Sequence, residues 1–159
     1  MDKIYIAIDF DGTCVTHEFP NEGKDIGAVP VLKRLVKEGH GLILYTMRSG
    51  AHLESAVQWF LKNGVKLAGI QYNPNQTSWT SSNKCYAQLY IDDAALGAPL
   101  KFDKNVSDRH FVDWTAVEAI CEMDGILPPS SEFLGAIRED MEEANQKSAV
   151  EQRKGLADG

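Results

Sequence analysis

Two aspartates separated by a single residue form the most informative motif of the sequence. Asp9 and Asp11 stand in the run Ile8-Asp9-Phe10-Asp11-Gly12-Thr13, directly after an apolar segment. Side chains at positions i and i+2 of an extended chain lean the same way, roughly 6–7 Å apart. At that separation one carboxylate can attack an electrophile while the other serves the leaving group. Gly12 permits a sharp turn and exposes backbone N–H groups that can hold an anion. The alternative interpretation is a plain acidic turn after a strand.

A second acidic pair follows another apolar segment further along the chain. Asp92 and Asp93 come directly after Tyr90-Ile91. Carboxylates at the end of a buried strand are costly unless a cation or a hydrogen-bond network compensates them. Mg²⁺ prefers carboxylate and water oxygens as ligands. The pair is therefore a candidate magnesium site, with an acidic turn again as the alternative.

Two further polar residues gain meaning only in combination with these acids. Thr46 ends the apolar run 42–45, where its hydroxyl can bind a phosphoryl oxygen. Lys84 stands eight residues before Asp92, and an ammonium near clustered carboxylates offsets their repulsion and can stabilise a transferring phosphate. Taken alone, a threonine that starts a turn and a solvated lysine are the simpler interpretations.

Strand-like and helix-like segments alternate along the chain, which predicts how these residues are positioned. The pattern indicates strands over 3–9, 41–46, 67–72, 88–91 and 99–102, with helices beginning near Pro30 and spanning 51–62, 113–124 and a segment after 130. Alternation of this kind favours an α/β fold with a doubly wound, mainly parallel sheet in a Rossmann-like three-layer α/β/α sandwich. Ligands of such sheets gather beyond the carboxyl ends of the strands, where Asp9, Thr46 and Asp92 are expected.

The length and composition limit the classes of protein to which the chain can belong. The chain has 159 residues, 43% of them hydrophobic, and a net charge of −7, so we expect a folded core domain over 1–128 followed by a helix and polar tail over 129–159. The negative charge opposes generic binding to nucleic acid or to an anionic membrane. The apolar runs are too short to span a membrane and the amino terminus lacks a signal-peptide pattern. Three cysteines without a CxxC motif fit a reducing, cytoplasmic setting.

In this order, the four signals resemble the signature motifs of the haloacid dehalogenase (HAD) superfamily. The motif at 8–13 is highly specific for that superfamily when a strand precedes it, and the resemblance covers the chain from Asp9 to Asp93. It implies a HAD-type hydrolase, namely a Mg²⁺-dependent phosphatase that acts on phosphoric monoesters. It says little about the residues after about 102.

The resemblance also implies a role for each matching residue. Asp9 would be the nucleophile that becomes an aspartyl-phosphate, and Asp11 the general acid/base. Thr46 would bind the phosphoryl group, and Lys84 would hold it in register with the nucleophile. The Mg²⁺ ion would be bound by Asp9, by the backbone carbonyl of Asp11, and by Asp92, Asp93 or both.

Members of this superfamily usually carry an inserted cap domain, for which this chain has little room. The segments 14–45 and 47–83 are largely consumed by core helices and strands, so we expect no substantial cap and an open site. Open sites of this kind serve bulky or macromolecular phosphoesters or are covered by a neighbouring subunit, so a homo-oligomer is one expectation. Arg48 is a further candidate for substrate contact, with a solvated loop side chain as the alternative. His17 and the other histidines show no metal-ligand spacing and are interpreted as ordinary residues.

Two functions of other classes compete with the phosphatase interpretation. A receiver-like signalling module also has a phospho-accepting aspartate, but there the acidic pair follows the first strand and the acceptor ends a middle strand. Here the acidic pair comes last, so the order fits poorly. A non-catalytic binding protein that retains the fold is the second alternative.

Overall fold

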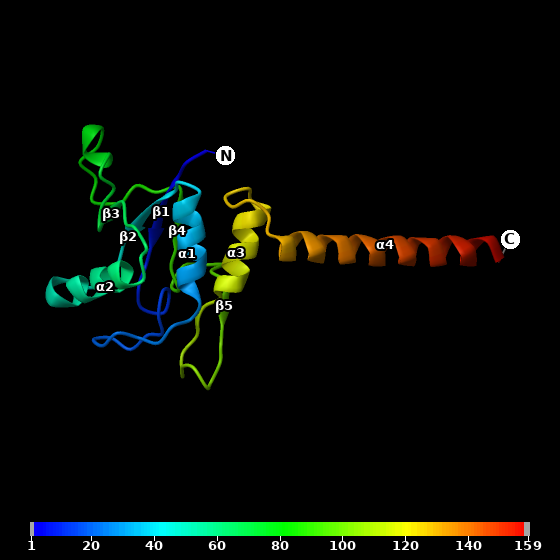
Figure 1. Cartoon of the computed structure of the whole chain (residues 1–159), viewed down its shortest axis with the longest axis horizontal. Coiled ribbons are helices and arrows are strands. Elements are labelled where there is room, and N and C mark those ends of the chain that lie inside the picture. Colours follow the sequence, from blue (N-terminus) through cyan, green and yellow to red (C-terminus); the bar gives the residue numbers. More distant parts are fainter. Residues whose placement is uncertain (1, 158–159) are drawn as a thin grey trace.

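A four-stranded parallel sheet forms the centre of the molecule. The computed structural model describes residues 2–157. The sheet has the order β3-β2-β1-β4, so the chain crosses over between neighbouring strands (Figure 1). Its strands are β1 (Tyr5–Ile8), β2 (Gly41–Leu44), β3 (Gly69–Ile70) and β4 (Leu89–Ile91). With its flanking helices this is a Rossmann-like α/β sandwich, as the alternating pattern predicted.

The helices begin and end where the sequence provides the expected signals. They are α1 (Ala28–Lys37), α2 (Gly50–Lys62), α3 (Trp114–Met123) and α4 (Ser131–Ala157). Pro30 lies in the first turn of α1, where its missing N–H costs nothing. The chain leaves α1 through Gly39, whose φ of +89° favours glycine. The Asp113 side chain caps α3 by accepting a hydrogen bond from the backbone N–H of Thr115, at 3.1 Å.

One face of the sheet and the helices share a single hydrophobic core. Alternate residues of β1 and β2 are fully buried in this core together with residues of α1 and α2, among them Ile6, Ile8, Leu42, Leu44, Leu32, Leu35 and Phe60. Burial of each large aliphatic side chain contributes about 1.5–3 kcal/mol, and the core fixes the strand register on which the site depends. In that register Ile8 stands beside Leu44 on one side and Ile91 on the other.

The expected strand at 99–102 does not join the central sheet. It is β5 (Leu100–Lys101), which pairs antiparallel with β6 (Phe111–Val112) in a separate two-stranded ribbon. The residues between the two strands form a hairpin loop. The backbone N–H of Val112 donates to the carbonyl of Gly12 at 2.9 Å, so this ribbon is tied to the turn after β1.

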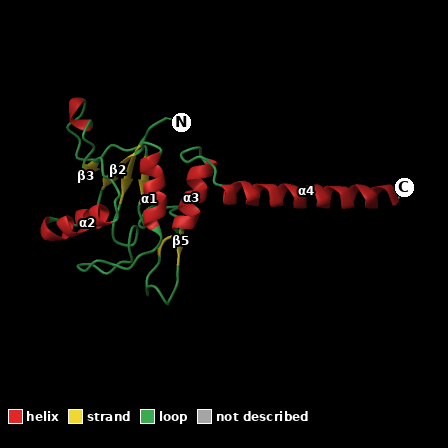
Figure 2. Ribbon diagram, in the orientation of Figure 1, coloured by secondary structure: helices red, strands yellow, loops and turns green. Residues whose placement is uncertain are grey.

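The segments on either side of β2 carry no separate cap domain within residues 2–157. The segment before it consists of loops and α1, and the segment from Thr46 to β4 contains α2, β3, the short 3-10 helix η1 (Gln76–Ser78) and loop (Figure 2). Within the described residues, no cap domain therefore covers the edge of the sheet where β1 and β4 end, as expected.

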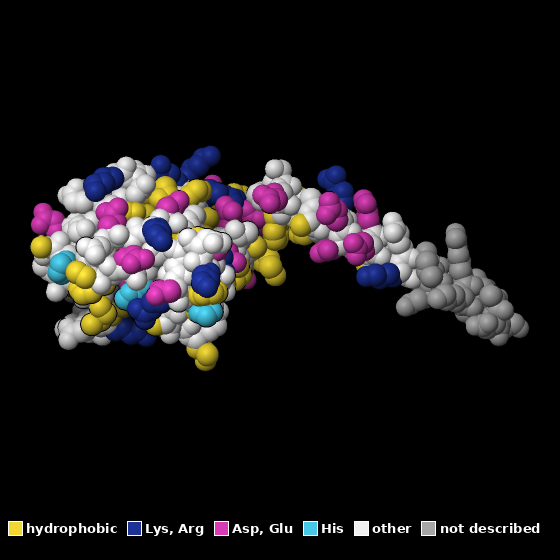
Figure 3. Space-filling view, turned by 90° about the horizontal axis from the view of Figure 1, so that it is seen from below, with side chains coloured by type: hydrophobic (Ala, Val, Ile, Leu, Met, Phe, Trp, Pro, Cys, Tyr) yellow, Lys and Arg dark blue, Asp and Glu magenta, His cyan; other side chains and the backbone are white. Residues whose placement is uncertain are grey.

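The last helix projects away from the rest of the molecule (Figure 1). The apolar side chains of Leu134, Ile137 and Met141 on α4 are exposed. Figure 3 shows hydrophobic side chains gathered where this helix leaves the body. No helix within the described residues is long and apolar enough to cross a membrane. The expected boundary near residue 128 stays a prediction, and residues 158–159 of the predicted tail lie outside the described residues.

Candidate active site

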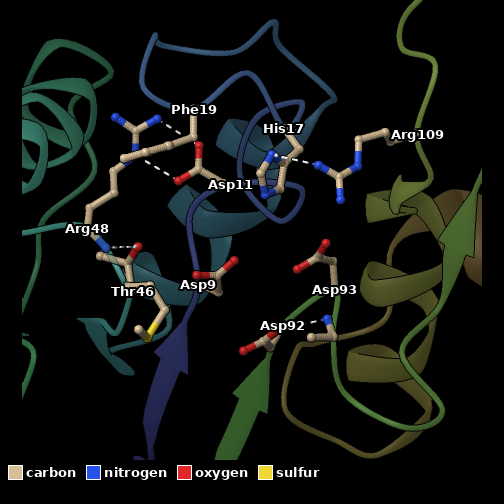
Figure 4. A pocket seen from close by; sticks show the side chains of 11 residues that line it. Asp9, Asp11, His17, Phe19, Thr46, Arg48, Asp92, Asp93 and Arg109 are labelled. Atoms are coloured by element: carbon tan, nitrogen blue, oxygen red, sulfur yellow. Dashed lines mark hydrogen bonds and ion pairs between the residues drawn. The ribbon is translucent and has the colours of Figure 1, made fainter.

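The two acidic pairs of the sequence meet at one edge of the sheet. Asp9 directly follows β1 and Asp92 directly follows β4, and these two strands are parallel neighbours. One carboxylate oxygen from each of Asp9, Asp92 and Asp93 lies within 4.8 Å of the other two (Figure 4). Aspartates some eighty residues apart in the sequence thus form one cluster, because parallel strands end at the same edge.

The turn after β1 holds this cluster together. Gly12 has a φ of +81°, and a Cβ at this position would lie 2.4 Å from a carboxylate oxygen of Asp93, so only glycine allows this approach. The hydroxyl of Thr13, which is fully buried, donates to the Asp9 carboxylate at 3.1 Å. The same hydroxyl accepts from the backbone N–H of Asp93 at 3.0 Å. One side chain therefore links the ends of β1 and β4.

Without a bound cation, the carboxylates of the cluster repel one another. Burial raises the pKa of Asp9 from its ordinary 3.8 to about 7, and the nearby charges of Asp92 and Asp93 add to this effect. Burial and Asp92 also raise the pKa of Asp93, while His17 and Arg109 oppose that rise. Three crowded carboxylates, of which Asp9 and Asp93 have raised pKa values, favour the binding of a positive charge among them.

The donor set of the cluster suits a hard divalent cation. All three side chains offer carboxylate oxygens, the ligands that Mg²⁺ prefers, and none offers sulfur or imidazole nitrogen. The three oxygens are close enough together to serve one ion. The residues present therefore fit the magnesium site that the sequence predicted, and they do not by themselves identify the metal.

Asp11 is engaged by a buried arginine. The guanidinium of Arg48 donates from Nε and from one terminal nitrogen to the two oxygens of Asp11, both at 2.7 Å. It also donates to the backbone carbonyls of Pro20 and Asn21. Arg48 is only 2% exposed, so the interpretation as a solvated loop side chain is wrong. It lines the pocket, but its donors already serve Asp11 and the 20–21 loop, which leaves little for the expected substrate contact.

Thr46 lies in the pocket beside these acids, two residues beyond the end of β2. Its hydroxyl oxygen accepts from the backbone N–H of Arg48 at 3.2 Å, so the hydroxyl proton is available to a ligand. Its backbone N–H donates to the side-chain oxygen of Gln71 at 3.0 Å, which fixes the turn. Thr46 therefore shares a pocket with Asp9, and its phosphoryl contact stays a prediction.

The structure does not bring Lys84 to this pocket. Its ammonium lies 5.8 Å from the centre of the Tyr90 ring, in a different hollow that Trp79 and Tyr86 also line. The physical reason is the path of the segment between β3 and β4. The side-chain amide of Gln76 donates a hydrogen bond to the carbonyl of Lys84 at 2.8 Å. The neighbouring Asn75 donates to the hydroxyl of Tyr5. Tyr5 starts β1, at the end of the strand opposite Asp9.

The pocket also includes residues that the sequence did not indicate. His17, Phe19 and Arg109 line the same hollow of about 590 Å³ as Asp9 and Thr46 (Figure 4). A terminal nitrogen of Arg109 lies 3.2 Å from Nδ1 of His17. His17 follows the first motif closely, which is a weak signal, whereas nothing in the sequence connects the hairpin residue Arg109 to this site.

Comparison with known proteins identifies a structural relative whose activity is not stated. The chain is similar to a solved structure described as a conserved protein from Bacteroides thetaiotaomicron, with 31% sequence identity and a TM-score of 0.64. The similarity covers 77% of this chain and 93% of that one. No protein-family model and no curated protein matches the sequence.

Proposed function

The chain belongs to the same protein family as the conserved Bacteroides thetaiotaomicron protein, and we propose that it is a Mg²⁺-dependent phosphomonoester hydrolase of the HAD type. One observation carries the proposal. Asp9, in the motif Asp9-Phe10-Asp11-Gly12-Thr13, converges with Asp92 and Asp93 within reach of a single cation. A nucleophilic carboxylate, a second acid two residues later and a cation site are the parts that this reaction needs.

In the proposed first step, a carboxylate oxygen of Asp9 attacks the phosphorus of the substrate in line with the departing alcohol. The bond from phosphorus to the ester oxygen breaks, and an aspartyl-phosphate forms. Asp9 must be ionised to attack. Its pKa of about 7 keeps a large fraction protonated at neutral pH when no cation is present, so a bound cation favours the reactive form.

Asp11 carries the proton in both proposed steps. It gives a proton to the departing alcohol, and later takes one from the water that attacks the aspartyl-phosphate and releases Asp9. Asp11 accepts two hydrogen bonds from the guanidinium of Arg48. Its acid role therefore requires that the side chain turn from Arg48 toward the ester oxygen when substrate binds.

The remaining groups of the site would bind the metal and the phosphoryl group, and the metal would neutralise negative charge. Asp9, the backbone carbonyl of Asp11 and an acid of the pair 92–93 would hold Mg²⁺, which supplies charge neutralisation between an anionic nucleophile and an anionic substrate. The Thr46 hydroxyl would bind a phosphoryl oxygen. Because the three cysteines are buried and free, we propose a reducing, cytoplasmic setting.

The test is hydrolysis of an aryl phosphate with Mg²⁺ or with a chelator, for the wild type, Asp9→Asn and the control Asp140→Asn. Asp140 is exposed on α4, so its variant controls for loss of one negative charge. We expect metal-dependent turnover that falls by at least about a thousandfold in Asp9→Asn only.

Two other results would redirect the proposal. Equal rates for the wild type and Asp9→Asn would remove Asp9 from the chemistry. A stable phosphoprotein without turnover would favour the receiver-like interpretation, and neither turnover nor phosphorylation would favour a binding protein.

A further inference from the structure

Two residues from distant parts of the chain form one wall of the pocket. His17 follows the turn after β1, and Arg109 lies in the β5–β6 hairpin just before β6 (Figure 4). A guanidinium can only donate, so the 3.2 Å contact requires that Nδ1 of His17 accept. The imidazole then carries its proton on Nε2. The pair therefore offers the remaining guanidinium N–H groups and one imidazole N–H as donors.

Arg109 is a cation of the pocket that acts on Asp93 only from a distance and is not engaged in a direct ion pair within the described residues. The other pocket arginine, Arg48, is buried and paired with Asp11. Arg109 is exposed, and within the described residues it forms no ion pair with a carboxylate. A guanidinium with free donors at the rim of a ligand pocket is suited to a carboxylate or phosphate.

The position of the pair separates it from the phosphoryl group that Asp9 would receive. In Figure 4, Thr46 and Arg48 lie on one side of Asp9, and Arg109 and His17 lie on the other side, above Asp93. A hollow of about 590 Å³ has room for an organic group in addition to a phosphate. A group that contacts Arg109 therefore belongs to the part of the substrate that leaves as the alcohol.

We infer that the preferred substrates are phosphomonoesters whose alcohol carries a second anionic group, a carboxylate or another phosphate, bound by Arg109 with His17. This inference rests on the proposed phosphatase function and adds a substrate class to it. His17 orients the guanidinium through Nδ1 and adds its own donor.

The test compares substrates that differ only in the second charge. One arm uses phosphate esters of straight-chain hydroxy acids with two to five methylenes, each beside its uncharged primary amide. A second arm replaces the carboxylate by phosphate, using bisphosphates of the matching diols. The readout is the ratio of kcat/KM for the charged and the uncharged ester, measured for the wild type, Arg109→Gln and Lys104→Gln. Lys104 is an exposed cation of the same hairpin, which makes it the matched control.

We expect a ratio of about two to five at the best spacer length, since an ion pair at an exposed site is worth roughly that factor. The ratio should fall toward one in Arg109→Gln, stay near the wild-type value in Lys104→Gln, and shrink with added salt. Preference for the carboxylates or for the bisphosphates identifies which anion is recognised.

The outcomes separate this inference from the proposed function. Turnover of all esters with a ratio near one, or a ratio that Arg109→Gln leaves unchanged, overturns the second-anion site and leaves the phosphatase proposal standing. No Asp9-dependent turnover of any ester overturns both.

Discussion

At the scale of single residues, the site concentrates negative charge that the protein leaves partly uncompensated. Asp9 is partly buried beside Asp92 and Asp93, and the hydroxyl of Thr13 is a side-chain donor that reaches it. Such an arrangement lowers the stability of the metal-free fold, and proteins retain costs of this kind where function requires them. The raised pKa of Asp9 makes this cost measurable.

We expect Asp9→Asn to stabilise the metal-free protein above neutral pH. The native state keeps the Asp9 proton up to about pH 7, whereas the unfolded chain loses it near 3.8. The native state thus binds more protons between these values, so the free energy of unfolding contributed by Asp9 falls as pH rises from 4 to 7. Asparagine does not titrate. In chelator at pH 8 the variant should be more stable by about 1–3 kcal/mol, and at pH 4 the difference should vanish.

Urea unfolding at both pH values measures this difference, with Asp140→Asn as the control. Added Mg²⁺ should stabilise the wild type and not Asp9→Asn. A variant that is no more stable than the wild type at pH 8 would contradict the assignment of a buried, destabilised carboxylate.

The sequence predicted the residues that strand ends position and missed those that loops position. Asp9, Thr46 and Asp92 were predicted to converge because the carboxyl ends of parallel strands share one edge. Lys84 was expected there from its place in the order of the four motifs. That order does not reveal that the segment between β3 and β4 folds around the buried amides of Asn73 and Gln76. Arg109 enters the pocket from a hairpin loop, for which the sequence has no signal.

At the scale of elements, the geometry of the acid cluster depends on the turn that follows β1. It is held from outside by α3 and β6. The indole of Trp114 donates to the carbonyl of Thr13 at 2.7 Å, and Val112 donates to Gly12. Elements beyond residue 110 therefore stabilise a motif at residues 9–13, although they contribute no acid to the cluster.

Thr13→Val should both destabilise the protein and disturb the acid cluster. Valine has nearly the shape of threonine, so the substitution removes two hydrogen bonds and leaves the backbone N–H of Asp93 without its partner. A buried group left unpaired costs about 1–3 kcal/mol. The free energy of unfolding measures this cost, and Thr115→Val, at an exposed position on α3, is the control. Equal stability of the two variants would mean that the Thr13 hydroxyl does not link the two strand ends.

Element types were more predictable than element lengths and pairings. The strand expected over 67–72 is only Gly69–Ile70, because Gln71 adopts a positive φ of 65° that ends it. The two-residue strand β6 is too short to show a period, so its pairing with β5 could not be predicted.

At the scale of the whole molecule, the fold is a small α/β domain with a long helix leaving it. The helix α4 is capped by Ser130, whose hydroxyl accepts from the backbone N–H of Phe133 at 3.1 Å. Beyond its first turns it runs away from the domain (Figure 1). An ion pair in this part, Lys147 with Glu143, joins the helix to itself.

Deletion of residues 142–159 should leave the domain intact. We expect the free energy of unfolding to change by less than about 0.5 kcal/mol, since surface changes away from packed features are usually within that range. Circular dichroism should show loss of helix, and chemical unfolding should keep its midpoint. A large fall in stability or in phosphatase rate would indicate that this half of α4 packs on the domain or on a second copy.

The central claim is that Asp9 accepts the phosphoryl group, and trapping the acyl-phosphate tests it most directly. Asp11→Asn retains the nucleophile and lacks the base that activates water. An aryl phosphate releases an aryloxide that needs no proton from Asp11 to depart, so the intermediate should still form and then accumulate. Mass spectrometry after incubation with aryl phosphate and Mg²⁺ should find the phosphoryl group on the peptide that contains Asp9. The double variant Asp9→Asn/Asp11→Asn should carry none. A phosphoryl group on another residue, or equal labelling of the double variant, would contradict the account.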